Sequence, residues 1–184
     1  MRIVAGRWRG RPLVAPRGDT TRPTADRTRE ALFSMLASRL GSFEGLAVAD
    51  LFAGSGALGL EALSRGAGSC VFVEQDRAAL DALRANVDKL GAHGVDLRAA
   101  SVLALGRATT ALDLVMMDPP YGSGAGAVAA DKLTRLGWIG AETWVSIETA
   151  RDEPVDAPGF AIEAERSYGR ARITLLRRDQ AIIV

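Results

Sequence analysis

The sequence predicts an α/β fold built on a mostly parallel sheet of seven strands, with helices on both faces. Two observations carry this prediction. From residue 46 onward, apolar strand-like runs alternate with helix-like stretches, which is typical of a parallel sheet. Near the C-terminus two further apolar runs flank a short turn, so we expect a closing antiparallel hairpin that makes the sheet mixed.

The N-terminal residues, 1–23, are expected to form a small basic β-hairpin and a loop, appended to the main domain. Two short apolar runs, 3–5 and 13–15, flank a centre rich in glycine and arginine. The remaining residues, 24–184, are expected to form one domain, as a chain of this length allows. A packing helix opens that domain, because apolar residues recur at helical spacing up to Leu40.

The rest of the chain alternates between the two periodicities. Apolar runs bounded by loop residues predict strands at 46–51, 70–74, 95–99, 112–117, 143–148, 161–166 and 171–177. Helical spacing between them predicts helices at 57–65, 77–90 and 126–136. We expect the last two strands to pair with each other through the turn at 167–170.

Composition excludes several classes of protein. The hydrophobic content of 48% supports a substantial core, and no run reaches the roughly 18 apolar residues of a membrane span. The N-terminus lacks an apolar signal-peptide core, and a single cysteine, Cys70, excludes an internal disulfide framework. The only histidine, His93, has no accompanying metal-ligand cluster. We therefore expect a cytoplasmic protein that binds no metal and no membrane and acts as a monomer.

Positive charge is concentrated at the N-terminus. Residues 1–30 hold eight arginines against three acidic residues, a net charge of +5 in a chain whose total is +1. Such a basic arm is typical of proteins that bind a polyanion, although it also occurs as plain solvated surface. The candidates for RNA contact are Arg7, Trp8, Arg9, Arg11, Arg22 and Arg27. Trp8 either stacks on unpaired bases or anchors the hairpin on the domain.

The motif Asp118-Pro119-Pro120-Tyr121 follows the predicted strand 112–117. It combines a carboxylate acceptor, a backbone that proline makes rigid, and a flat aromatic face. These groups suit a planar ring that carries an amine, such as a nucleobase. In isolation, Asp118 would equally serve as a turn-capping carboxylate and Tyr121 as a packing residue.

A glycine loop lies upstream, at residues 50–59. Gly54, Gly56 and Gly59 match the dinucleotide-binding fingerprint between a strand and a helix. Glu74 ends the next strand, where an acid accepts hydrogen bonds from ribose hydroxyls. A nicotinamide-dependent oxidoreductase is therefore one interpretation of this loop.

Asp50 argues for a different nucleotide. A carboxylate beside a pyrophosphate would be repelled by about 1 kcal/mol at 4 Å in water, and by more where solvent is excluded. It would instead attract the ammonium group of S-adenosylmethionine, which also has a ribose for Glu74 and carries no phosphate. Strand ends at one edge of an open α/β sheet form a common crevice, so we expect Asp50 and Asp118 to face one pocket.

Together, residues 50–59, Glu74 and 118–121 resemble the class I S-adenosylmethionine-dependent methyltransferases that act on amino groups. The N-terminal stretches Arg2-Ile-Val-Ala-Gly-Arg-Trp-Arg-Gly-Arg-Pro-Leu13 and Arg22-Pro-Thr-Ala-Asp-Arg-Thr-Arg-Glu-Ala-Leu-Phe33 are more specific. They are similar to the bacterial small-subunit ribosomal RNA methyltransferase D family, which modifies the exocyclic N2 of a guanine in 16S ribosomal RNA. The resemblance covers nearly the whole chain. It implies a Rossmann-like fold, S-adenosylmethionine as cofactor, and 16S ribosomal RNA as partner, free or in a partly assembled small subunit.

The resemblance also implies a role for each site residue. Asp118 and the Pro119 carbonyl would accept the two N2 hydrogens, while Tyr121 would stack on a base flipped into the site. The residues implied to bind the cofactor are Asp50, Ala53, Gly54, Gly56, Glu74 and Ser101. Ser101 is a departure, because many methyltransferases carry Asp or Asn after the third strand.

Two alternatives remain open. An adenine-N6 amino-methyltransferase acting on DNA or RNA would use the same amino chemistry, although this chain leaves little room for a recognition domain. A non-catalytic ribosome-assembly factor that binds RNA is the alternative from another class of function.

Overall fold

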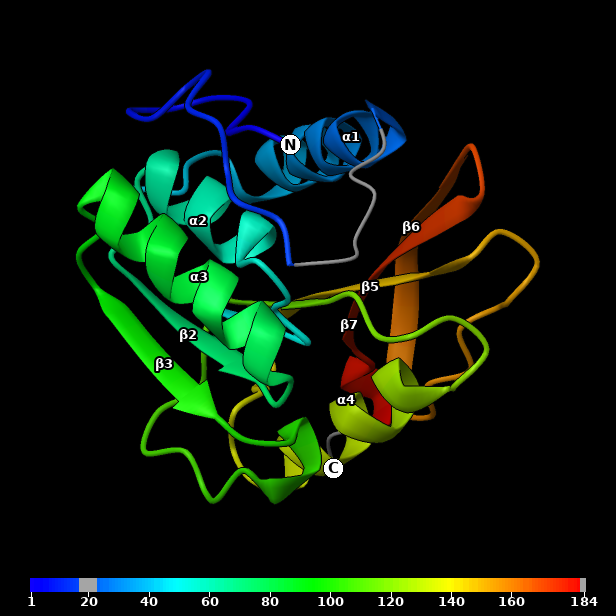
Figure 1. Ribbon diagram of the computed structural model, residues 1–184. Helices are drawn as coiled ribbons and strands as arrows, with labels where there is room; N and C mark the ends of the chain where they lie inside the picture. The colour runs from blue at the N-terminus through cyan, green and yellow to red at the C-terminus, as the bar shows by residue number, and fades with distance from the viewer. Residues whose placement is uncertain (17–22, 183–184) are drawn as a thin grey trace.

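The computed structural model describes residues 1–16 and 23–182 (Figure 1). In this part of the chain a single sheet has seven strands in the order β3-β2-β1-β4-β5-β7-β6. The first five strands in that order, β3 to β5, run parallel to one another, and β7 runs antiparallel to both β5 and β6. The predicted α/β fold with a mixed, mostly parallel sheet is confirmed.

Every predicted strand is present, with small differences at the ends. The strands are β1 Ala47–Leu51, β2 Ser69–Glu74, β3 Val95–Ala99, β4 Leu114–Met117, β5 Trp144–Ala150, β6 Phe160–Tyr168 and β7 Ala171–Arg178. β4 begins at Leu114 and not at residue 112, because Leu112 donates its backbone N–H to Trp138, outside the sheet, at 3.0 Å. β6 is longer than predicted and has an irregular register between Ile162 and Ala164.

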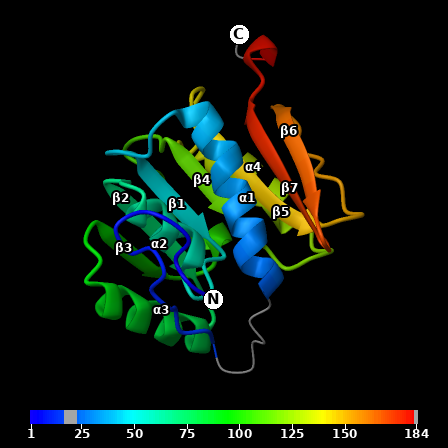
Figure 2. The same ribbon diagram turned by 90° about the horizontal axis from the view of Figure 1, so that it is seen from above.

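Helices cover both faces of the sheet. The described α-helices are α1 Pro23–Leu40, α2 Ala57–Ser64, α3 Arg77–Leu90 and α4 Ala125–Arg135, with short 3₁₀ helices η1 Val102–Ala104 and η2 Gln180–Ile182. Helices α1, α2 and α3 lie on one face and α4 on the other (Figure 1). Seen from above, α1 crosses the middle of the sheet (Figure 2). None of the described helices is both long and apolar enough to cross a bilayer.

Two hydrophobic cores result, one on each face. Successive strand residues point to opposite faces, so in β4 Leu114 and Met116 enter the core under α1 to α3. Val115 and Met117 enter the core against α4. All four side chains are at most 1% exposed. A strand buried on both faces has a continuous apolar run, which is why the sequence pattern locates β4 well.

The strand order reverses between β1 and β4. From β1 the chain passes through α2 to β2 and β3 on one side, and then returns to β4 on the other side. In doubly wound sheets the crevice at such a switch point binds ligands at the carboxyl ends of the strands. Asp50 lies near the end of β1 and Asp118 directly follows β4.

The N-terminal residues 1–16 fold back on themselves like the predicted hairpin, but without two regular strands. Among these residues a single antiparallel bridge pairs Arg2 with Pro12. Backbone hydrogen bonds also join the two halves of the segment: Ile3 donates to Arg11, Gly10 to Ile3 and Leu13 to Met1, at 2.8 to 3.0 Å. Other backbone groups of the segment bond to side chains of α2 and α3. Buried Glu61 accepts the N–H groups of Val4 at 2.8 Å and Ala5 at 3.0 Å.

Further contacts fix the same segment on the domain. Ser64 accepts the N–H of Trp8 at 3.0 Å, and Asn86 exchanges two hydrogen bonds with the backbone of Val14. Trp8 is only 7% exposed and belongs to the core, with the Arg7 guanidinium 4.2 Å from its ring centroid. The alternative of an exposed stacking indole is therefore wrong. Trp8 anchors the segment.

Candidate active site at the switch point

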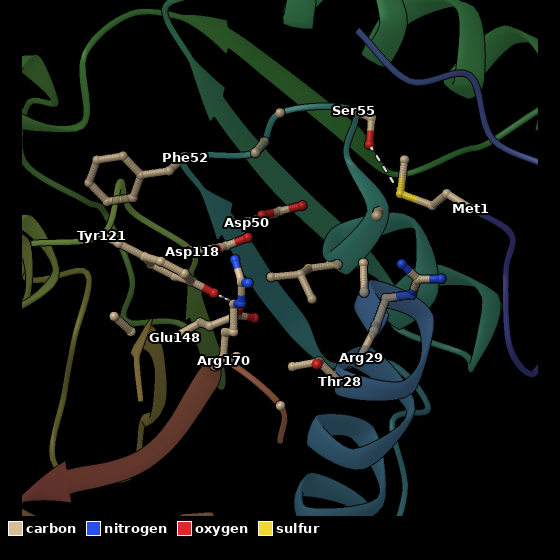
Figure 3. A pocket seen from close by; sticks show the side chains of 18 of the residues that line it. Met1, Thr28, Arg29, Asp50, Phe52, Ser55, Asp118, Tyr121, Glu148 and Arg170 are labelled. Atoms are coloured by element: carbon tan, nitrogen blue, oxygen red, sulfur yellow. Dashed lines mark hydrogen bonds between the residues drawn. The ribbon is translucent and has the colours of Figure 1, made fainter. Parts of the chain in front are cut away.

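A cavity of ≈ 1160 Å³ opens at the carboxyl ends of β1 and β4. It is bounded by the β1–α2 loop, the residues after β4, the end of β5, the β6–β7 turn and the start of α1 (Figure 3). Its polar or aromatic lining residues include Asp50, Phe52, Ser55, Asp118, Tyr121, Glu148 and Arg170. The glycine loop and the Asp118–Tyr121 motif thus meet in one cavity.

Asp50 is the most deeply buried acid of the cavity, at 1% exposure. Its Oδ2 accepts the backbone N–H of Gly59 at 2.8 Å. Burial raises the pKa of Asp50 well above its usual range, the Gly59 bond opposes this, and the charges of Asp118 and Glu74 add to it. A carboxylate whose charge is disfavoured in this way is stabilised by a cationic ligand.

The turn between β1 and α2 needs unusual backbone angles. Phe52, Gly54 and Gly56 have φ values of +61°, +55° and +81°, in the left-handed region that residues other than glycine rarely adopt. Gly59 is required for another reason. A Cβ on Gly59 would lie 2.3 Å from the Phe72 ring, so only glycine lets α2 pack this closely on β2.

Glu74 holds this loop in place. Its Oε2 accepts the N–H of Gly54 at 2.8 Å, and its Oε1 accepts those of Gln75 and Asp76, each at 2.8 Å. The side chain is half-buried at the end of β2. Glu74 therefore positions the glycine loop from the neighbouring strand.

The six residues predicted to bind a cofactor fall into two groups. Asp50, Ala53 and Gly54 line the cavity. Three others do not line it: Gly56, Glu74 and Ser101. The Ser101 hydroxyl oxygen accepts the N–H of Leu103 at 3.3 Å and caps η1.

The Asp118–Tyr121 motif leaves β4 at the opposite wall. Asp118 is exposed to the cavity, whereas Pro119 is buried. Tyr121 is 49% exposed, and its hydroxyl donates to Glu148 Oε1 at 2.8 Å. An aromatic ring held by its polar end presents its faces to a ligand.

Glu148 and Arg170 complete the cavity; Glu148 ends a predicted strand whose end could face the pocket, but sequence patterns gave neither residue a role in the site. Glu148 lies on β5, and burial raises its pKa while the Tyr121 hydrogen bond lowers it. Its sequence signal was an acid near the end of an apolar strand, which structural roles also produce. Arg170 reaches the cavity because β7 pairs with β5, placing Ala171 opposite Ala150.

The basic arm borders the cavity on one side. Met1, Ala15 and Pro16 line the cavity itself. Arg9 and Arg27 line a separate surface depression of ≈ 450 Å³. The other predicted RNA contacts lie as follows: Arg7 and Arg11 are exposed, Trp8 is buried, and Arg22 is outside the described residues. Among residues 1–16 and 23–182, no group of His, Cys, Asp and Glu side chains is arranged to hold a metal ion.

Comparison with known proteins finds similarity along nearly the full length. The family model described as Conserved hypothetical protein 95 matches residues 1–177. Ribosomal RNA small subunit methyltransferase D of Escherichia coli K12 is 36% identical, over 97% of this chain and 90% of its own length. The solved structure of the Escherichia coli protein yhhF matches with a TM-score of 0.81 at 35% identity, covering 97% of this chain and 98% of that one.

A more distant structure shares the fold. Magnesium protoporphyrin IX methyltransferase from Synechocystis, solved with bound S-adenosylmethionine, has a TM-score of 0.68 at 16% identity. The match covers 88% of this chain and 87% of that one.

Proposed function

This chain belongs to the small-subunit ribosomal RNA methyltransferase D family, and from that premise we propose that it methylates the N2 amine of a guanine in 16S ribosomal RNA. The methyl donor is S-adenosylmethionine. The observation that carries the proposal is that a buried carboxylate, Asp50, lines the same cavity as Asp118 and Tyr121 of the Asp118–Tyr121 motif.

The residues at the switch point fit this donor. Asp50 offers the ammonium group a buried carboxylate, and the backbone of Ala53 and Gly54 borders the same space. Glu74 is the proposed ribose contact, since a carboxylate oxygen that accepts one amide keeps a second lone pair. The cavity of ≈ 1160 Å³ exceeds the roughly 300–1,000 Å³ of a pocket for one small molecule, so it suits a donor and a base together.

Two further cofactor contacts remain proposals with indirect support. Gly56 shapes the loop, since a Cβ there would lie 2.2 Å from Leu83 Cδ1. Ser101 follows β3, the next strand after Glu74, where the adenine end of the donor would lie.

The chain's residues align and activate the acceptor. When bound, the donor supplies a methyl group already activated by a sulfonium. The Asp118 carboxylate and Pro119 carbonyl accept the two N2 hydrogens and stabilise the positive charge that develops on N2. The N2 lone pair forms the new N–C bond, the electron pair of the broken S–C bond stays on sulfur, and one N2 proton leaves toward Asp118. Tyr121, held by Glu148, stacks on the base and keeps it in line.

The arm supplies the RNA contacts in this proposal. Residues 1–23 act as the RNA-binding part and residues 24–184 as the catalytic domain. Arg7, Arg9 and Arg11 are exposed on the arm, which borders the cavity. The substrate is 16S ribosomal RNA, alone or in a partly assembled small subunit in the cytoplasm, and the enzyme acts as a monomer.

Replacing Asp118 tests the proposal. We expect Asp118→Ala to abolish transfer and to leave donor affinity within a few-fold, because Asp118 contacts the acceptor amine. Mass spectrometry of 16S ribosomal RNA from a deletion strain should show loss of one N2-methylguanosine. Wild type should restore it and Asp118→Ala should not, while calorimetry reports donor binding.

The control is Asp156→Ala, which removes an exposed acid outside the cavity and should restore methylation fully. Near-normal methylation by Asp118→Ala would refute the assignment. Appearance of N6-methyladenosine in place of N2-methylguanosine would favour the adenine alternative. Donor binding by wild type without transfer to any assembly intermediate would favour the non-catalytic factor.

A further inference from the structure

The groups assigned to the reaction, Asp118, the Pro119 carbonyl and Tyr121, do not by themselves distinguish the N2 amine of guanine from the N6 amine of adenine. A carboxylate, a carbonyl and a stacking ring suit guanine N2 and adenine N6 equally. The bases differ at the neighbouring ring nitrogen, because N1 of guanine carries a hydrogen and N1 of adenine carries a lone pair. We propose that Glu148 selects guanine by accepting that N1–H. This inference rests on the function proposed above and adds its specificity residue.

The sheet places Glu148 beside the reacting amine. Strands β4 and β5 are parallel neighbours, with Met117 opposite Ile147. The next residues along each strand path are Asp118 and Glu148, and both line the cavity. Figure 3 shows both acids on the same side of the cavity as Tyr121. A base that offers its amine to Asp118 therefore turns the rest of its hydrogen-bonding edge toward Glu148.

Glu148 is also tied to the ring that is proposed to stack on the base. Its Oε1 accepts the Tyr121 hydroxyl at 2.8 Å. A carboxylate has about four acceptor sites, so this bond leaves capacity for a base N–H. The carboxylate and the aromatic face are thus held at a fixed separation, which is what recognition of a flipped base requires.

The chemistry of this edge separates the bases. With guanine, a carboxylate acceptor meets the N1–H donor. With adenine, it meets the N1 lone pair, and two acceptors then face each other in a partly desolvated site. Sites that leave a buried polar group unpaired reject the wrong substrate strongly.

Arg170 matches the next group along the same edge of guanine, the O6 atom. It lines the same cavity as Asp118 and Glu148, and Figure 3 labels all three among the lining residues. A guanidinium has only donors, so it matches the guanine O6 that follows N1. The corresponding atom of adenine is C2–H, which accepts nothing. Asp118, Glu148 and Arg170 together offer acceptor, acceptor and donor to the amine, N1–H and O6 of guanine.

The test replaces the target guanine by 2-aminopurine, which keeps the N2 amine but has an unprotonated N1 and lacks O6. The RNA is assembled by ligation around a synthetic segment that carries either base at the position mapped by mass spectrometry. We expect wild type to prefer guanine by at least about 10²-fold in kcat/KM. Glu148→Gln keeps an oxygen for Tyr121 and adds an N–H donor suited to a bare N1. It should lower the preference by at least about tenfold, the loss expected for one charge-assisted hydrogen bond.

Equilibrium binding gives a second readout that needs no transfer. With S-adenosylhomocysteine in place of the donor, the affinities for the guanine and 2-aminopurine RNAs are compared by competition. The affinity ratio should fall in Glu148→Gln as the kcat/KM ratio does. Calorimetry of S-adenosylhomocysteine binding, expected within a few-fold of wild type, verifies that the variant is folded.

Two controls separate base reading from positioning. Tyr121→Phe keeps the ring and removes the bond to Glu148, and Glu163→Gln makes the same chemical change on β6 outside the cavity. Both should keep the wild-type preference for guanine, whatever their rates.

An unchanged preference in Glu148→Gln overturns the inference. So does an equal loss of preference in Tyr121→Phe, since Glu148 would then act only through the ring. Failure of wild type to methylate guanine N2 removes the proposed function, and the inference with it. If Glu148→Gln lowers the rate of methylation but keeps the preference for guanine over 2-aminopurine, the inference is overturned and the proposed function stands.

Discussion

Asp50 opposes the stability of the protein and serves its proposed function. Folding removes this carboxylate from water, and its pKa is therefore raised. A group whose pKa is higher in the folded state stabilises the fold while protonated, and that contribution is lost as the pH rises through the folded-state pKa. In its ionised form Asp50 is a buried charge, and a cationic ligand would stabilise that form. A pKa shifted by burial in this way is common at functional sites.

We predict opposite effects of Asp50→Asn on stability and on ligand binding. The amide removes the buried charge and still offers Gly59 an oxygen, so the unfolding temperature without ligand should rise. The gain should grow as the pH increases through the raised pKa of Asp50. Loss of the ammonium partner should weaken donor binding at least tenfold, because truncating one member of a buried charge pair costs about 2–5 kcal/mol.

Thermal unfolding from acid to neutral pH and calorimetry measure the two effects. Asp156→Asn, at an exposed position, is the matched control and should change neither. A pH-independent unfolding temperature difference together with unchanged donor affinity would contradict the role given to Asp50.

At the scale of elements, the contact between α2 and β2 sets the shape of the glycine loop. Gly59 lies within α2, directly against Phe72 and Cys70 of β2. The same residue donates its N–H to Asp50. One close approach of helix to strand therefore fixes the loop geometry and the position of the buried carboxylate.

Gly59→Ala should destabilise the protein although alanine is the better helix former. Helix propensity favours alanine by about 1 kcal/mol. The new Cβ would lie 2.3 Å from the Phe72 ring and 2.6 Å from Cys70 Sγ, and overpacking of this kind costs about 1–3 kcal/mol. We expect a net loss of free energy of unfolding in urea titrations, and weaker donor binding as α2 moves.

Gly106→Ala is the control, because no heavy atom lies within 4 Å of its added Cβ. It should change the free energy of unfolding by less than about 0.5 kcal/mol. Stabilisation by Gly59→Ala would mean that α2 has room to move away from β2.

At the scale of the whole molecule, the basic N-terminal segment is part of the domain. Glu61 of α2 is fully buried and accepts bonds from Val4, Ala5 and Arg65. Breaking a buried charge network by removing one member costs about 3–5 kcal/mol. The arm is therefore held rigidly beside the cavity, and its exposed arginines have a fixed position relative to the proposed catalytic residues.

Removing arm charge should weaken RNA binding and its dependence on salt. We predict that Arg9→Ala combined with Arg11→Ala lowers affinity for 16S ribosomal RNA. Each lost phosphate contact should make the slope of log affinity against log salt shallower by about 0.7 for single-stranded RNA. Arg7 is left intact because it stacks on Trp8. Filter binding over a salt series measures the slope.

The control pair is Arg107→Ala with Arg135→Ala, which removes equal charge from exposed positions away from the arm. It should leave the slope near that of wild type. An unchanged slope in the arm variant would remove Arg9 and Arg11 from the RNA site.

Local pattern predicted the strands and helices of the domain well and the N-terminal segment only in part. Strand β4 and helix α3 follow from apolar periodicity, which is a property of neighbouring residues. Among the described residues, the expected hairpin at 3–5 and 13–15 has one β-bridge and three backbone hydrogen bonds between its halves, but no regular strands. Its backbone groups bond to Glu61 and Asn86, which lie 56 to 72 positions away along the chain. No local pattern contains those partners.

The sequence by itself determined the strands of the sheet and the expectation that Asp50 and Asp118 face one pocket, whereas the strand order and its switch point came from the structure. Parallel strands have their carboxyl ends at one edge, so residues that end such strands are expected at the same edge of the sheet. Only the tertiary structure decided that Trp8 is buried, that Glu74 braces the loop, and that Glu148 and Arg170 complete the cavity. Burial and cavity lining depend on contacts between distant segments, and those exist only once the chain has folded.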